Sequence, residues 1–533
     1  MSQTTALRII LLIGVGLAIL SLIGELRAPL NADAAWLVYS AGRLLRGQLL
    51  YVDILEINPP LIVWLNLPGA YLSHALQIPA TLVFRAGMVL LVAGSLAVCW
   101  SLVRRFPGVT SLGAGLAALA TLFVLLPLVG GIFGQREHIA LALSLPLVAA
   151  TALRCRGVSL RTGFAYLLGL AAGLGFAIKP HYGAVWLCLL AYRSWAGRGS
   201  MRVLQPEDLV IMCTAVYYGL AVMVLTPSYF ALAEGSARDY LAFGSHPLSY
   251  ILLDDSPAIW YYIALGAWLL FGRAPRDDVL GGALAAAGAG FLIAVALQHK
   301  GWSYHFYPVN GCAFLLAVRT LMLPPPAQES GPMIVRLMKS AAFVIYVITV
   351  GLFVVVQLRA AAARAWGPPT PRQALQLASR EAVRRQTDAR SILVISSQLR
   401  DGYPLVNDSG LECRASYSVM WFPLVYYRSY AGPSQETRYR SYKQMSPNER
   451  FAFDRVVEDF VLHQPDLLVL ESPSLNQRRT RFPGGFDYLR YFGQDPWFAQ
   501  TAARYTQVAE VQGLTVLRRR GPPTARLITP DIH

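Results

Sequence analysis

The sequence predicts a polytopic α-helical membrane protein with about eleven transmembrane helices and a C-terminal α/β domain. Of its 533 residues, 55% are hydrophobic and only 14% are charged, whereas soluble domains carry about 25% charged residues. Apolar runs of the length that spans a bilayer, about 17–25 residues, recur along the first two thirds of the chain. After residue 358 the sequence becomes polar and Arg-rich. We therefore expect a membrane domain at 1–358 and a soluble domain at 359–533.

The membrane domain is expected to begin with a span. The apolar run within 1–27 is long and no small-residue cleavage site precedes the polar loop, so it does not fit a cleavable signal peptide. The expected spans are 8–26, 80–103, 110–131, 138–153, 163–178, 181–195, 209–226, 257–271, 279–297, 304–322 and 340–357.

Charged loops between these segments predict their orientation. With a cytoplasmic N-terminus, one set of loops follows the positive-inside bias. That set holds Arg104, Arg105, Arg154, Arg156, Arg161, Arg193, Arg198, Arg202, Arg273, Arg276, Arg336 and Lys339. The other loops, periplasmic in a bacterium, hold Asp33, Asp53, Glu56, Glu137, Asp239, Asp254 and Asp255. An odd number of spans also places 359–533 in the periplasm, and the chain in the inner membrane.

The apolar run 61–78 is predicted not to cross the membrane. Counting it as a span would move every later Arg cluster to the outside, against the charge bias. Asn66, Pro68 and Gly69 interrupt it. It is therefore expected to be an interfacial or re-entrant helix that follows the periplasmic loop 28–60.

Net charge and cysteine spacing exclude several classes. The charge of +16 is explained by cationic cytoplasmic loops, and no nucleic-acid-binding motif occurs. The six cysteines show no CxxC or Cys/His metal spacing, so neither a disulfide framework nor a structural zinc site is supported.

The soluble domain alternates strand-like and helical segments. Strands are expected at 391–397, 466–472 and 513–519, and a helix at 447–463. This alternation predicts a small α/β domain.

Loop 28–60 carries the first of four polar clusters. Asp33 precedes an amphipathic segment, where it is either a functional carboxylate or only the N-cap of a surface helix. The stretch "YVDILEINPP" adds Asp53, Glu56 and Asn58. These groups are either functional or simply solvated in the loop.

The other three clusters lie at the ends of apolar segments. They are "GQREH", "IKPHYG" and "QHKGWSYHFYP". Ionisable groups at the membrane edge are candidates for function, while capping, snorkelling and an aromatic belt are the structural alternatives. The candidate residues are Arg136, Glu137, His138, Lys179, His181, Lys300, Tyr304 and His305.

All four clusters fall on the same predicted face, and their chemistry is complementary. A carboxylate can deprotonate an acceptor hydroxyl. Lys, Arg and His can hold a lipid phosphate and stabilise the charge that develops when it leaves.

In these motifs the chain resembles the GT-C membrane glycosyltransferases, and most closely the family 39 group of aminoarabinose transferases and protein O-mannosyltransferases. The likeness covers about residues 8–320 in order and spacing. Its motifs are Asp33, then Tyr51, Asp53 and "NPPL" at 58–61, a non-crossing helix, Arg85 in "VFRAGMVLLVAG", "GQREH" and "HKGWSYHFYP".

The resemblance implies a polyprenyl-phosphate sugar donor, a glycan, lipid or protein acceptor such as lipopolysaccharide, and chemistry on the external face. Asp33 would be the general base. The other acids, Asp53, Glu56 and Glu137, would orient the substrates, and a divalent cation is the cofactor they could hold. Arg136, His138, Lys179, Lys300 and His305 would contact the donor phosphate.

The chain departs from the family pattern at three places. Ala34 stands where close relatives often have a second acid, Asn58 replaces a Lys, and Glu137 with His138 replaces an Asp. Two alternatives remain: a non-catalytic transporter or lipid-binding protein, and an inactive relative that acts as a scaffold. A transporter would be expected to show internal repeats with paired broken helices, which this sequence lacks.

Overall fold

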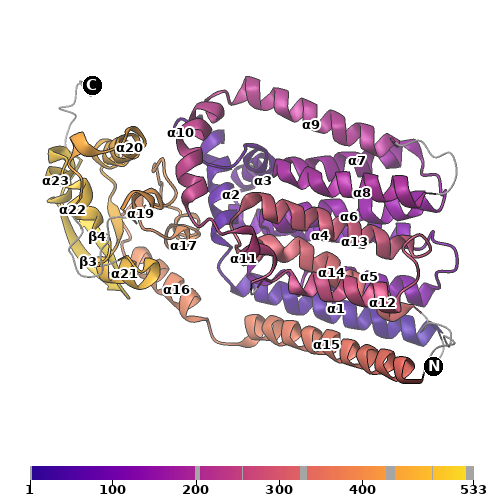
Figure 1. Cartoon of the computed structure of the whole chain (residues 1–533). Coiled ribbons are helices and arrows are strands. Elements are labelled where there is room, and N and C mark those ends of the chain that lie inside the picture. Colours follow the sequence, from indigo (N-terminus) through magenta and orange to yellow (C-terminus); the bar gives the residue numbers. More distant parts are fainter. Residues whose placement is uncertain are drawn as a thin grey trace. The chain divides into compact units, whose positions relative to one another are not determined.

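The computed structural model describes residues 3–197, 204–254, 256–323, 333–427, 439–482 and 484–523 (Figure 1). Arg198, Arg202 and Asp255, which entered the charge argument, lie outside the described residues. The chain divides into two compact units. The helical unit comprises Met1–Ala28, Phe84–Val224 and Gly244–Pro368, and the α/β unit comprises Pro29–Val83, Leu225–Phe243 and Pro369–His533.

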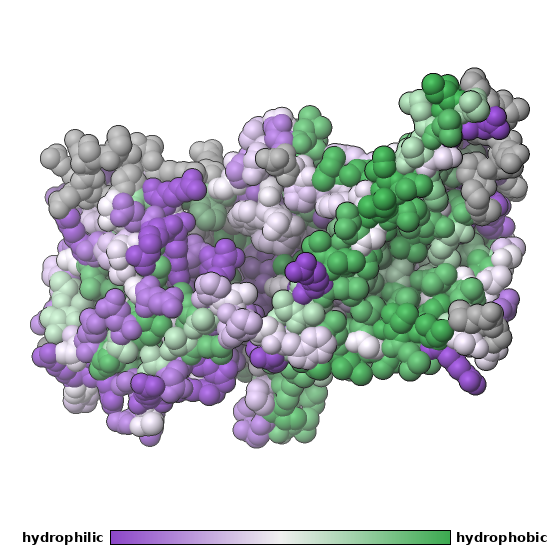
Figure 2. All heavy atoms as spheres, turned by 90° about the horizontal axis from the view of Figure 1, so that it is seen from below, coloured by the Kyte–Doolittle hydropathy of each residue, from purple (hydrophilic) through white to green (hydrophobic). Residues whose placement is uncertain are grey.

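Each of the eleven segments predicted to span the membrane contains a helix. These are α1 (Gln3–Arg27), α4 (Ala80–Val103), α5 (Ser111–Leu125), α6 (Arg136–Cys155), α7 (Thr162–Ala177), α8 (Gly183–Ala196), α9 (Pro206–Leu225), α12 (Ile259–Phe271), α13 (Val279–Gln298), α14 (Tyr307–Met322) and α15 (Met333–Trp366). Among the described residues, α1, α4, α6, α9, α13 and α15 are long and apolar enough to cross a membrane. Apart from the buried α6, these helices carry exposed apolar side chains, and Figure 2 shows a broad green surface of this kind, as a lipid-facing bundle requires.

Helix α6 forms the centre of the helical unit, because 94% of its apolar window is buried. Around it, α13 packs closely against α8. A Cβ atom added to Gly290 on α13 would lie 2.4 Å from the Cα atom of Val185 on α8. Only glycine therefore permits this approach of the two backbones.

Ion pairs connect the ends of several helices. Arg154 at the end of α6 donates two hydrogen bonds to Glu207, from Nε to Oε1 (3.0 Å) and from an Nη atom to Oε2 (2.9 Å). Arg193 of α8 likewise donates to Asp208. Both acids lie in the first turn of α9 and are buried. Two of the arginines that predicted orientation are thus neutralised within the helical unit.

The α/β unit contains a four-stranded sheet in the order β1-β2-β4-β3. Strands β1 (Ile392–Ile395) and β2 (Leu467–Glu471) are parallel and fully buried. Strand β4 (Leu514–Arg519) pairs antiparallel with both β2 and β3 (Tyr505–Val511). The three predicted strands are therefore confirmed, and β3 was missed because its polar residues Thr506, Gln507 and Glu510 interrupt the apolar pattern.

Helices surround this sheet. The predicted helix 447–463 is confirmed as α20 (Pro447–His463), which Ser446 caps by accepting the N–H of Glu449. The remaining helices are α16 (Pro371–Arg384), α17 (Leu399–Gly402), α18 (Leu405–Ser409), α19 (Phe422–Tyr427), α21 (Pro473–Thr480), α22 (Tyr488–Phe492) and α23 (Pro496–Ala502).

The α/β unit also includes chain from the first predicted loop. Helices α2 (Ala32–Leu45) and α3 (Leu61–Leu76) belong to it, as does α10 (Ser228–Ala242). At about 1.5 Å per residue, the 16 residues of α3 extend about 24 Å, which is less than the roughly 30 Å hydrocarbon core. The non-crossing character of α3 and the boundary after residue 358 stay predictions; the division into compact units falls after Pro368.

Arg43 of α2 explains why the first loop packs on the C-terminal segment. Its buried guanidinium donates to the carbonyl oxygens of Ala415 and, at 3.1 Å, Asp53. The N–H of Leu55 donates to the carbonyl oxygen of Ser416 (3.0 Å). A buried arginine is stable only with such partners, so these contacts fix residues 43–55 against 415–416.

Candidate functional site

Three of the four polar clusters meet in the helical unit. Glu137 begins α6, Lys179 precedes the 3₁₀ turn η2 (Pro180–Tyr182), and His305 lies in the 3₁₀ turn η3 (Ser303–Phe306). The Lys179 Nζ atom donates to Glu137 Oε1 at 2.5 Å, and His305 Nε2 lies 3.8 Å from the same oxygen. Residues about 40 and 170 positions apart thus surround one carboxylate, and we call this group the Glu137 cluster.

The Glu137 cluster is buried but not saturated. The Tyr182 hydroxyl also donates to Glu137 Oε1 (3.3 Å), and Lys179 Nζ donates to Gln298 Oε1 (3.2 Å). In contrast, Glu137 Oε2, His181 Nε2 and His305 Nδ1 have no hydrogen-bond partner within the described residues. Buried polar atoms without partners are costly, so this arrangement favours completion by a ligand.

Local backbone geometry places Glu137 in this cluster. Gly134 adopts a φ of +78°, and a Cβ atom there would lie 2.4 Å from the Phe84 ring. The turn that begins α6 is therefore accessible only to glycine. At the other side, His299 (φ 52°) ends α13 and Gly301 (φ 59°) follows it, turning the chain toward η3.

Lys300 adds a second cation near the aromatic residues of η3. Its side chain is only 3% exposed, and Nζ lies 5.7 Å from the Trp302 ring centroid. Burial lowers the pKa of Lys300 to about 8, because the charged ammonium is favoured less in a poorly hydrated place. Tyr304 lies over Lys179, with 6.0 Å between Nζ and the ring centroid.

Two candidates beside Glu137 differ in their surroundings. His138 is fully buried, and its Nδ1 accepts the N–H of Gly134 at 3.2 Å. Its ring packs against Phe133 and Tyr307. This geometry fixes the ring of His138, whose Nε2 atom has no hydrogen-bond partner within the described residues. Arg136 is 7% exposed and contributes positive potential at Glu137.

Sequence reasoning missed two members of the cluster. Tyr182, which contacts Glu137, stands within the quoted "IKPHYG", and Gln298, which contacts Lys179, begins "QHKGWSYHFYP", but neither was a candidate residue. The position of a neutral hydroxyl or amide in the sequence does not indicate a functional contact. The partner of such a group is known only once the fold is known.

The acids of the first loop belong to the α/β unit, where each has a distinct environment. The predicted alternative that Asp33 is the N-cap of α2 is wrong, because Asn31 occupies that position and its side chain accepts the N–H of Asp33 (3.0 Å). Asp33 is instead a half-buried acid in the first turn of α2, where the helix dipole favours a negative charge.

The stretch "YVDILEINPP" is organised by its own polar groups. Asp53 accepts the N–H of Leu49 at 2.8 Å and closes a turn. Buried Glu56 accepts the indole N–H of Trp36 and, at 2.8 Å, the N–H of Asn58. Tyr51 donates to the Asn58 carbonyl oxygen (2.8 Å). These contacts give Asp53, Glu56 and Asn58 a structural role in the loop, whatever their part in chemistry.

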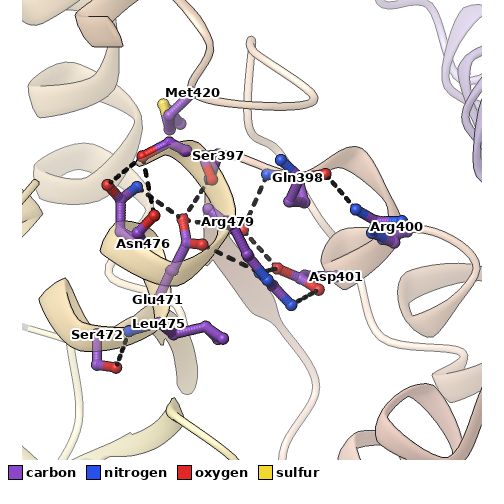
Figure 3. A network of polar contacts seen from close by, with 12 residues as sticks. Ser397, Gln398, Arg400, Asp401, Met420, Glu471, Ser472, Leu475, Asn476 and Arg479 are labelled. Atoms are coloured by element: carbon purple, nitrogen blue, oxygen red, sulfur yellow. Dashed lines mark hydrogen bonds and ion pairs between the residues drawn. The ribbon is translucent and has the colours of Figure 1, made fainter. Parts of the chain in front are cut away.

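A second buried charge cluster lies in the α/β unit, at the carboxyl ends of the parallel strands β1 and β2 (Figure 3). Arg479 of α21 bridges Glu471 (3.0 Å) and Asp401, to which it donates from both terminal nitrogens. Ser396 donates to Asp401, while the N–H of Ser397 (2.7 Å) donates to Glu471. Every oxygen of the two carboxylates is thereby occupied, and we call this group the Glu471 cluster.

A metal site is not evident in the described part of the chain. No group of three or more His, Cys, Asp or Glu side chains there is placed to hold an ion.

Comparison with known proteins adds one finding. A crystal structure of ArnT from Cupriavidus metallidurans bound to undecaprenyl phosphate resembles this chain with a TM-score of 0.56, covering 98% of this chain and 100% of that one at 14% sequence identity. No protein-family model matches the chain, and no curated protein sequence matches it. The likeness confirms the predicted GT-C-like membrane fold.

Proposed function

We propose that this chain is an integral-membrane glycosyltransferase. It moves a sugar from a polyprenyl-phosphate donor to a hydroxyl of a lipid, glycan or protein acceptor, on the periplasmic face of a bacterial inner membrane. The observation that carries the proposal is the fold, which the chain shares along its whole length with an ArnT bound to undecaprenyl phosphate. Membership of family 39 and a lipopolysaccharide acceptor are finer parts of the same proposal.

The Glu137 cluster supports a phosphate-binding role. Lys179 and Lys300 supply positive charge from buried positions, and the imidazoles of His181 and His305 each keep a ring nitrogen without a partner among the described residues. Charge-assisted bonds to an oxyanion are stronger than neutral ones. Glu137 would orient Lys179, because a carboxylate bonded to one face of the ammonium leaves its remaining protons directed elsewhere.

In the proposed reaction, one bond to the anomeric carbon forms while another breaks, and one proton is transferred. The acceptor oxygen forms a bond to the anomeric carbon as the bond from that carbon to the phosphate oxygen breaks. The hydroxyl proton would go to a carboxylate, the role that the family resemblance gives to Asp33, and the electron pair of the broken bond would stay on the leaving polyprenyl phosphate. Lys179 and Lys300 would stabilise that developing charge, and general-base catalysis would assist the attack.

Transfer from purified protein tests the proposal. Wild type, Asp33→Asn and Asn31→Ala would be incubated with labelled polyprenyl-phosphate sugars, and loss of sugar from the lipid measured. We expect Asp33→Asn to lower transfer by about 10²–10⁴ with unchanged stability. Asn31→Ala is the matched control, because it removes the cap of α2 at a cost of about 1 kcal/mol but leaves Asp33 in place.

The outcomes separate the alternatives. Full activity of Asp33→Asn would transfer the role of base to Asp53 or Glu56. Binding of the lipid donor without any loss of sugar in wild type would favour a lipid-binding scaffold. A phosphatase fused to the C-terminus reports the side of the membrane, and a cytoplasmic signal from it would overturn the proposed face.

A further inference from the structure

A cavity lies in the helical unit at the far end of α14 from the Glu137 cluster. It measures about 220 Å³, and α4, α5, α6, α13 and α14 line it. Its wall includes Arg319 and Met322, whereas the Glu137 cluster is beside Tyr307 at the start of the same helix. At about 1.5 Å per residue, the twelve residues between Tyr307 and Arg319 correspond to about 18 Å. The two places are therefore separate.

The walls of this cavity are mostly apolar. Each helix contributes small or aliphatic side chains, for example Cys99, Ala117, Leu145, Leu284 and Met322. The two threonine hydroxyls are engaged within their own helix: Thr110 accepts the N–H of Gly113 (3.0 Å) and Thr121 donates to the Ala117 carbonyl oxygen (2.8 Å). The interior therefore suits a hydrocarbon chain.

Arg319 is the charged group that lines the cavity. Its Nε donates to Asp278 Oδ1 at 2.8 Å, and its side chain is 27% exposed. Within the described residues no hydrogen bond uses its two terminal nitrogens. Asp278 is itself buried and holds Arg319 in place, since its other oxygen accepts the indole N–H of Trp268 (2.9 Å). The guanidinium is thus oriented, with its fork of donors available to an anion.

We propose that this cavity binds a membrane phospholipid, with one acyl chain among α4, α5 and α14 and the phosphodiester on the terminal nitrogens of Arg319. The donors at the cavity favour this occupant, because a mostly apolar cavity beside the terminal N–H groups of an oriented guanidinium matches a hydrocarbon chain joined to a phosphate. The site would take a lipid of the leaflet opposite the Glu137 cluster. It does not depend on the proposed glycosyl transfer.

Photolabelling tests the proposal. The full chain, reconstituted in vesicles of phosphatidylcholine, would be labelled with a phosphatidylcholine that carries a diazirine in its acyl chain, and with a diacylglycerol of the same chains. Labelled peptides would be mapped by mass spectrometry. We expect phosphatidylcholine to label α5 and α14 at the cavity, and diacylglycerol, which lacks the phosphate, to label them about tenfold less.

Variants of the cavity supply the controls. Ala117→Trp fills the cavity and should lower its labelling about tenfold, whereas Leu116→Trp on the exposed side of α5 should not. Gly113→Leu is a second filling variant, should Ala117→Trp not fold. Arg319→Gln should reduce labelling by phosphatidylcholine to the level of diacylglycerol.

Three results would overturn the proposal. They are equal labelling by the two probes in wild type, labelling that persists in both filling variants, and displacement of the probe by undecaprenyl phosphate at a lower concentration than by phosphatidylcholine. The last would assign the cavity to a polyprenyl lipid.

Discussion

Glu137 in the helical unit and Glu471 in the α/β unit are both buried carboxylates beside a cation, yet their hydrogen bonding differs. Glu471 receives bonds at both oxygens, from Arg479, Ser397 and Asn476. Glu137 accepts hydrogen bonds from Lys179 and Tyr182 at one oxygen, while its other oxygen has no partner among the described residues.

This difference separates a structural cluster from a candidate binding site. A buried ion pair stabilises a fold only when further hydrogen bonds satisfy its remaining atoms, as in the Glu471 cluster. In and beside the Glu137 cluster, Glu137 Oε2, His181 Nε2 and His305 Nδ1 have no hydrogen-bond partner among the described residues, which stability alone would not favour. Both clusters are therefore buried and charged. They differ in whether every carboxylate oxygen has a hydrogen-bond partner among the described residues.

Removing Lys179 should produce the largest effect. Lys179→Met leaves Glu137 buried without its cation, at a cost of about 3–5 kcal/mol of stability, and should lower transfer by about 10²–10³ if Lys179 stabilises the leaving phosphate. Thermal unfolding and sugar transfer would both be measured.

The double variant Lys179→Met with Glu137→Gln provides the decisive control. It removes both charges and should restore much of the stability while transfer remains low. Recovery of transfer together with stability would make the Glu137 cluster structural, like the Glu471 cluster.

The matching change in the α/β unit is Arg479→Met. It leaves Asp401 and Glu471 buried together without a cation, so we expect a loss of about 3–5 kcal/mol in stability. Transfer per folded molecule should stay within about twofold of wild type. A loss of transfer in molecules that remain folded would contradict the structural assignment of the Glu471 cluster.

Asp459 of α20 tests whether hydrogen bonds alone, without a bonded cation, can stabilise a buried carboxylate in its charged form. Ser416 donates to both of its oxygens, at 2.6 and 3.0 Å, yet burial raises its pKa to about 6. The folded state therefore holds the proton more tightly than the unfolded state, so the contribution of Asp459 to stability is greatest below about pH 4 and is lost as the pH rises through about 6.

The expected loss for Asp459 is up to about 3 kcal/mol, because each pH unit of displacement in a pKa is worth roughly 1.4 kcal/mol. Thermal unfolding between pH 4 and 7 measures it. Asp459→Asn keeps the shape of the side chain and should flatten this part of the profile; identical profiles for wild type and variant would refute the assignment.

The smallest expected effect is the loss of the Lys300 charge at high pH, which should weaken binding of the donor lipid. Since its pKa is about 8, Lys300 is charged below that pH and neutral above it. Affinity for undecaprenyl phosphate should fall about tenfold as the pH rises from 7 to 9.5, which is the loss of one charge-assisted contact.

Lys300→Arg is the control, because a guanidinium remains charged throughout this range. The variant should bind with little dependence on pH. If wild type shows the same flat profile, Lys300 does not contact the phosphate.

Several features of this protein are determined by the sequence alone. A bilayer requires long apolar helices with satisfied backbones, so the eleven predicted segments contain helices. Burying ionisable groups beside lipid is costly, so "GQREH", "IKPHYG" and "QHKGWSYHFYP" stood out as candidates. The alternation of strand-like and helical segments likewise located β1, β2, β4 and α20.

Other features were decided only by the tertiary structure. The contacts of Glu137 with Lys179 and His305 join residues far apart in the chain, and the contact of Arg43 with Ala415 spans 372 positions. Whether Asn31 or Asp33 caps α2 depended on a single backbone turn, because both residue types cap well. The Glu471 cluster was not predicted, since its members resemble ordinary surface charges in the sequence. Local patterns specify which groups are buried, whereas the partners that saturate them, or leave them open, arise only when distant segments pack together.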